Sequence, residues 1–191
     1  MGRFPSGNID SDVLIWKYSC KRICFSSLFA ERISVPIGFV ALINRNGRAT
    51  TIFEGSVEYV SKWADVYFVR TRVNEQQMWG VRDIPCIDPD SGLVMPMGIS
   101  GLFVFNVEYP DRLVRQTAGH VDVMSVRYFM RQMLLPRLRL AIKVILECDI
   151  PERNLVVVKE RIMDNIESIL NVFDEYGLVL ADNTFTVSNL A

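Results

Sequence analysis

One segment, residues 64–80, constrains the fold more than any other part of the chain. It has the sequence ADVYFVRTR, followed by VNEQQM and a Trp-Gly pair. In ADVYFV, apolar or aromatic side chains occur in both sets of alternating positions. Both faces of an extended strand there are therefore largely apolar. We therefore predict a buried strand that ends in charged residues. The Trp-Gly pair is predicted to mark the place where the chain leaves this strand.

The composition indicates a globular protein and gives no global attraction to nucleic acid. The chain has 191 residues, of which 50% are hydrophobic, which is enough for one large domain or two small packed ones. Its 21 Lys and Arg residues are balanced by 22 Asp and Glu residues, for a net charge of -1. We therefore predict no nucleic-acid partner, and any contact with an anionic membrane must be local.

The cysteine and histidine content argues against metal or nucleophilic chemistry. The four cysteines are Cys20, Cys24, Cys86 and Cys148, and the single histidine is His120. A structural zinc site usually needs two close Cys or His pairs, and the second pair is missing. His120 is predicted to be a surface or capping residue, and no Walker A, G-x-S-x-G or G-x-G-x-x-G motif occurs. We predict no metal, no cofactor and no enzymatic activity.

The chain is not expected to cross a membrane by itself. No apolar run reaches the roughly 18 residues that a spanning helix needs, and the nearest, residues 33–43, contains Pro36 and Gly38. No signal peptide precedes the cysteines, so we expect reduced cytoplasmic thiols. The first residues, MGRFPS, formally fit an N-myristoylation pattern at Gly2, and Cys20 and Cys24 could carry a lipid or simply be buried.

Hydrophobic alternation predicts an antiparallel, meandering sheet. Short turns separate the predicted strands, among them Asn-Arg-Asn-Gly at 44–47 and Asp-Pro-Asp-Ser-Gly at 88–92. Such turns favour antiparallel over doubly wound parallel topology. We predict strands over residues 13–18, 37–43, 48–53, 64–72, 81–87 and 178–187, and one long strand or a bent pair of strands over residues 93–107.

Helices are predicted in the second half of the chain. A short helix is expected over residues 111–117, and a longer one from an N-cap at Asp122, with a kink at Pro136, to about residue 148. A last helix is expected from Asn154 to about residue 173, because apolar residues recur there at intervals of three and four. Gly177 then stands where a C-cap glycine belongs.

Four motifs occur in the order found in a known family. The first combines the buried strand with the Trp-Gly pair, the second is an Asp-Pro turn, the third is GLFVFNVEYPDRL and the fourth is FDEYGLVL. Together they resemble the SPFH or band 7 superfamily (stomatin, prohibitin, flotillin), most closely a bacterial branch described as virion-core-like. The positions that match the family pattern are Tyr67, Phe68, Thr71, Arg72, Trp79, Gly80, Asp88, Pro89, Tyr176 and Gly177.

The resemblance implies an α+β fold and a scaffolding function. It implies a flexible arm over residues 1–12 and one SPFH domain over 13–191, with an antiparallel sheet subdomain over about 13–84. A mixed subdomain over about 85–191 is expected to pack its helices on one sheet face. The implied function is a non-enzymatic, homo-oligomeric scaffold that organises a membrane patch or a protein partner at the inner face of the membrane. The alternative is a soluble adaptor, derived from a phage or mobile element, that binds one protein without a membrane.

A run of cations on the long predicted helix is the candidate contact surface. Interspersed aromatic and apolar residues would make this a basic amphipathic helix able to touch phospholipid or a partner. The alternative is an ordinary helix whose polar face lies in water. The cations are Arg127, Arg131, Arg137, Arg139 and Lys143.

Overall fold

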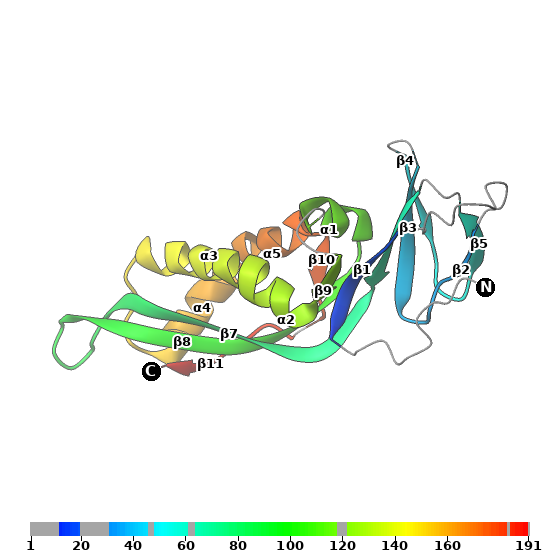
Figure 1. The fold of residues 1–191 in the computed structure, drawn as a ribbon. Coiled ribbons are helices and arrows are strands. Elements are labelled where there is room, and N and C mark those ends of the chain that lie inside the picture. The colour runs from blue at the N-terminus through cyan, green and yellow to red at the C-terminus, as the bar shows by residue number, and fades with distance from the viewer. Residues whose placement is uncertain are drawn as a thin grey trace. The chain divides into compact units, whose positions relative to one another are not determined.

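The chain folds into two compact units, each made of two separate stretches (Figure 1). Unit 1 consists of Met1–Arg72 and Val107–Phe129, and unit 2 of Val73–Asn106 and Met130–Ala191. The subdomain boundary expected near residues 84–92 does not divide the two units. Residues 84–92 form the tip of a single hairpin, because the strands on both sides of that turn pair with each other. The computed structural model describes residues 12–19, 31–45, 48–60, 64–117, 122–182 and 184–190.

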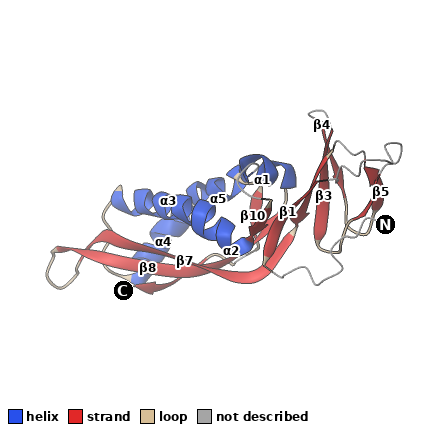
Figure 2. Ribbon diagram, in the orientation of Figure 1, coloured by secondary structure: helices blue, strands red, loops and turns tan. Residues whose placement is uncertain are grey.

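Unit 1 is built on a five-stranded antiparallel sheet (Figures 1 and 2). Its strands are β1 (Val13–Ser19), β3 (Phe39–Arg45), β4 (Arg48–Ile52), β6 (Asp65–Arg70) and β9 (Val123–Ser125). Their order is β4-β3-β6-β1-β9, so β6 lies in the centre. Val66, Phe68 and Val69 of β6 are buried, which confirms the predicted strand with two apolar faces. The predicted hairpin is also confirmed, as β3 and β4.

The two faces of this sheet are covered by different elements. A two-stranded ribbon, β2 (Glu31–Ser34) with β5 (Val57–Val60), contributes Ile33 and Val60 to a core that includes Phe68 of β6. The predicted short helix forms as α1 (Pro110–Thr117), which contacts β3 and β6 and buries Leu113 completely. A strand covered in this way has no polar face, which explains the composition of ADVYFV.

Unit 2 contains a long hairpin to which the C-terminal segment returns (Figure 2). Side chains of its second strand alternate between buried and partly exposed, which is the pattern of a sheet covered on one face. The prediction that the Trp-Gly pair marks a strand exit is wrong, because Trp79 and Gly80 lie inside a single strand. The predicted final strand is split in two, and both parts pair with the second strand of the hairpin. The strands are β7 (Arg72–Ile87), β8 (Val94–Val107), β10 (Leu178–Leu180) and β11 (Thr186–Leu190).

Three helices of unit 2 cover the buried face of the hairpin: α3 (Leu135–Glu147), α4 (Leu155–Asp164) and α5 (Ile166–Glu175). Phe173 of α5 packs edge-on against Phe103 of β8, with ring centroids 5.1 Å apart. The α+β architecture, with helices on one sheet face, is therefore confirmed.

The long helix begins later than predicted and is irregular at a different place. Val123–Ser125 form β9, and the helix starts at α2 (Val126–Phe129), where the Ser125 hydroxyl accepts a hydrogen bond from the Tyr128 N–H at 3.0 Å. Ser125 therefore caps the helix, and the predicted cap at Asp122 is wrong. A π-helical turn (Met130–Leu134) precedes Pro136, whose missing N–H removes a regular α-helical hydrogen bond to this part of the helix.

The predicted last helix is two helices separated at Asn165. This residue has φ -111° and ψ 24°, and its side chain donates to the Arg161 carbonyl at 2.9 Å. The helix begins where predicted, and the Asn154 side chain caps it by accepting a hydrogen bond from the Val156 N–H at 2.9 Å. Gly177 has φ +70°, as expected of a glycine that ends a helix.

Candidate functional site

Helix α3 has apolar side chains on its solvent face as well as on its core face. Leu138 and Ile142 are completely buried, as a core helix requires. On the opposite side, Leu140 is 64% exposed and Val144 is 52% exposed, four residues apart and therefore neighbours on one helical face. We call Pro136, Leu140 and Val144, with the cations beside them, the outer face of α3. Exposed apolar groups gathered among charges are typical of a contact surface.

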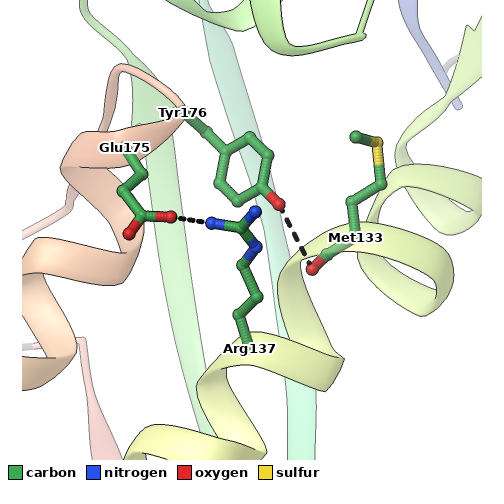
Figure 3. Close-up of polar contacts among 4 residues, drawn as sticks. All are labelled: Met133, Arg137, Glu175 and Tyr176. Atoms are coloured by element: carbon green, nitrogen blue, oxygen red, sulfur yellow. Dashed lines mark hydrogen bonds and ion pairs between the residues drawn. The ribbon is translucent and has the colours of Figure 1, made fainter.

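The cation on one side of the outer face is held within unit 2. Arg137 forms an ion pair with Glu175, and its guanidinium lies 5.4 Å from the ring centroid of Tyr176 (Figure 3). The Tyr176 hydroxyl donates to the Met133 carbonyl at 3.5 Å, and burial raises the pKa of this phenol. Arg137 therefore links α3 to the end of α5.

The cations on the other side border a pocket. This pocket, which we call the β7 pocket, has a volume of about 760 Å³, and Met78, Arg82, Arg139 and Lys143 contribute to its lining. The Arg139 guanidinium donates to the Gly80 carbonyl at 2.9 Å, which fixes α3 against β7. Among the residues that the structure describes, Lys143 and Arg82 have no ion-pair partner. Their charges are therefore available to a ligand or partner.

The remaining predicted cations belong to other elements. Arg127 lies on α2 in unit 1, whereas Arg131 lies on the π-helical turn in unit 2, and both are exposed. The five cations thus do not form one continuous patch within a single unit. Only Arg139 and Lys143 share the β7 pocket.

The Trp-Gly pair holds the sheet of unit 2 together. The Trp79 ring is buried and stacks on Phe185 with centroids 5.3 Å apart, and its Nε1–H donates to the Thr186 carbonyl at 3.2 Å. Gly80 provides the carbonyl that Arg139 binds. These contacts attach β11 and α3 to β7.

In unit 1, the residues that match the family pattern also make contacts that hold the fold together. The Thr71 N–H and hydroxyl both donate to the Gly38 carbonyl, at 3.0 and 3.2 Å, and the Thr71 carbonyl accepts from the Val107 N–H at 2.8 Å. The Tyr67 ring faces the ammonium of Lys17, 5.5 Å from the ring centroid. Arg72 is exposed and contributes to a separate pocket of about 430 Å³.

The Asp-Pro motif forms the turn between β7 and β8, as predicted. The Asp88 carboxylate accepts hydrogen bonds from the Ser91 hydroxyl at 2.5 Å and from the Ser91 N–H at 3.2 Å. The hydroxyl contact is the main cause that lowers the pKa of Asp88 below its ordinary value. Pro89 is exposed beside it, and Gly92 has φ +66°. This turn therefore carries a firmly ionised carboxylate.

An exposed apolar cluster surrounds this turn and was missed from the sequence. We call it the hairpin tip and define it by Ile87, Leu93, Val94, Met95 and Ile150, all of them exposed. Ile150 joins it because the next residue, Pro151, accepts a hydrogen bond from the Ile87 N–H at 2.9 Å. The signal in the sequence is the apolar run that follows Gly92, which the alternation pattern assigns to a strand without indicating its exposure.

Chemically reactive groups are sparse in the described part of the chain. In these residues no group of three or more His, Cys, Asp or Glu side chains lies close enough to hold a metal ion. Cys86 is buried, and burial raises the pKa of its thiol, which disfavours the reactive thiolate. Cys148 is exposed, and the predicted positions Gly2, Cys20, Cys24 and His120 lie outside the described residues. No described helix is both long enough and apolar enough to span a membrane.

Comparison with known proteins gives one family. The model of the SPFH domain-Band 7 family matches residues 56–191. No curated protein matches the chain. The match contains all four motifs on which the resemblance was based, and it spans most of the chain. The chain therefore belongs to the SPFH domain-Band 7 family.

Proposed function

We propose that this protein is a non-enzymatic scaffold that self-associates through its SPFH domain and organises a membrane patch or a protein partner. Membership of the family supports a scaffold-type role in general. The observation that carries the proposal is the outer face of α3, where Leu140 and Val144 are exposed among cations. An exposed apolar stripe with charged borders suits binding to another surface.

Self-association is the first expected result. Light scattering at tens of micromolar protein should give a mass of several chains, because exposed apolar patches on a protein of this size favour association. Dilution should lower that mass, and it provides the internal control. A mass of one chain throughout this range would contradict the scaffold.

Membrane contact is proposed to be peripheral, at the inner face of the membrane in the cytoplasm. The candidate surfaces are the outer face of α3 with the cations Arg131, Arg139 and Lys143, and the first 29 residues, most of which lie outside the described ones. Helical surfaces of this type bind through buried apolar area together with attraction to anionic lipid.

Sedimentation with vesicles tests this contact. The protein should sediment with vesicles that contain anionic lipid and do so less in high salt. Leu140→Ser should lower the partition coefficient about fivefold, since it removes roughly 1 kcal/mol of apolar burial. The matched control is Val156→Ser on α4, where the wild-type side chain is 61% exposed. If Val156→Ser weakens binding equally, the outer face of α3 is not the contact.

A soluble adaptor is the alternative function. It is favoured if the protein stays in the supernatant with all vesicles and is recovered from its host with one stoichiometric soluble partner. A complex that needs detergent for extraction favours the scaffold.

A further inference from the structure

The hairpin tip and the β7 pocket are complementary in charge. At the tip, Asp88, Asp90 and Glu152 contribute three carboxylates beside exposed apolar side chains, and the Arg153 guanidinium also acts on Asp88. Hydrogen bonds from Ser91 lower the pKa of Asp88 below its ordinary value, so its carboxylate is negatively charged at neutral pH. The hairpin tip is therefore an exposed apolar surface bordered by carboxylates.

The β7 pocket has the opposite character. Arg82, Arg139 and Lys143 contribute three cations to its lining, and no carboxylate is among the described residues that line it. The exposed thioether of Met78 adds apolar surface at the same place. An apolar ligand with carboxylates at its border satisfies both features.

One copy of the chain cannot bring these two surfaces together. Both belong to unit 2 and are joined by β7, along which Gly80 and Ile87 are about 23 Å apart at the usual rise of a strand. Because the paired strands β7 and β8 hold them apart, the tip of one molecule can only reach the pocket of another.

We infer that self-association is head-to-tail, with the hairpin tip of each copy inserted in the β7 pocket of the next. This inference rests on the proposed self-association and identifies its contact surfaces. Two different patches in contact form a heterologous interface, which closes into a ring or continues as a filament. Leu93 and Val94 of the tip then cover Met78, while Asp88 and Asp90 lie near Arg82 and Lys143.

Two variants, each damaged in one patch, test the inference. The tip variant is Leu93→Ser with Val94→Ser, and the pocket variant is Arg82→Glu with Lys143→Glu. Each should weaken self-association at least about tenfold, because it removes apolar contact or introduces like-charge repulsion. The changed side chains are exposed or half-buried, so the thermal unfolding of both variants should match that of the wild type.

Mixing the two variants provides the decisive observation. The tip variant keeps an intact pocket, and the pocket variant keeps an intact tip, so an equimolar mixture should form dimers and no larger species. An interface in which tip binds tip, or pocket binds pocket, could not give this complementation. Val156→Ser and Lys159→Glu, both on the exposed side of α4, are the matched controls and should associate like the wild type.

The outcomes separate the two proposals. A wild-type protein that is monomeric overturns the scaffold and this inference together. A wild type that associates, with tip and pocket variants that associate equally well, overturns only the head-to-tail contact. Two monomeric variants that remain monomeric when mixed also overturn it, and leave self-association established.

Discussion

Replacing Gly101 with alanine is expected to destabilise unit 2 by about 3 kcal/mol or more. A Cβ atom there would lie 1.7 Å from the Thr186 carbonyl oxygen and 2.7 Å from Trp79 Nε1. Neither atom can yield easily, because the carbonyl is backbone of β11 and the indole is stacked on Phe185 and bonded to that carbonyl. β11 must therefore move away from β8.

Thermal unfolding measures this effect against a closely matched control. For a chain of this size, the expected loss corresponds to a fall in Tm of roughly 6–12 °C. Gly80→Ala changes the same residue type on the neighbouring strand, where a Cβ would meet its nearest atoms at the ordinary distances of 3.5 and 3.6 Å. It should leave Tm unchanged or raise it slightly, since alanine has less conformational freedom to lose than glycine. Equal melting of the two variants would show that β11 does not pack as described.

Replacing Phe68 with alanine is expected to cost about 3–5 kcal/mol, the usual range for a buried phenylalanine. Phe68 is 1% exposed and lies in the core between the central strand of unit 1 and the β2–β5 ribbon. Its ring also stacks on Trp16 of the adjacent strand, with centroids 5.3 Å apart. The substitution therefore leaves a cavity and removes an aromatic contact.

Urea unfolding checks this value. Phe53→Ala is the control, because Phe53 belongs to the same unit but is 69% exposed, and its free energy of unfolding should change by no more than about 0.5 kcal/mol. Phe68→Leu should fall between the two, since it keeps most of the apolar volume. A loss below about 1 kcal/mol for Phe68→Ala would contradict the burial of this ring.

Features determined by neighbouring residues were predictable from the sequence. The turn at Asp88 and the caps at Asn154 and Gly177 form where local hydrogen bonds or a positive φ require those residue types. The two-faced burial of β6 was also visible, because its composition leaves no polar face.

Features that depend on distant segments were not predictable. The Trp-Gly pair suggested a strand exit because glycine is rare within strands, yet β11 returns from the C-terminus to pack on Trp79. The break at Asn165 interrupts an apolar stripe that continues through both helices, so periodicity alone could not reveal it.

The candidate site was predicted only in part. The sequence indicated the cations of α3, but not that Arg137 and Arg139 are engaged within unit 2. It indicated an amphipathic helix, but not that Leu140 and Val144 are exposed on the side opposite the core. Exposure depends on which neighbours pack against a helix, and no local pattern records that.

The interleaving of the two units dictates an order of events during synthesis. Val13 of β1 pairs with Ser125 of β9, so one edge of the first sheet to leave the ribosome stays unpaired until the whole β7–β8 hairpin has emerged. An uncovered edge in a nascent chain is a site for misplaced pairing with other chains. Unit 1 is completed only by Val107–Phe129 and unit 2 only by Met130–Ala191. A chain whose synthesis stops before residue 107 therefore leaves both units unfinished.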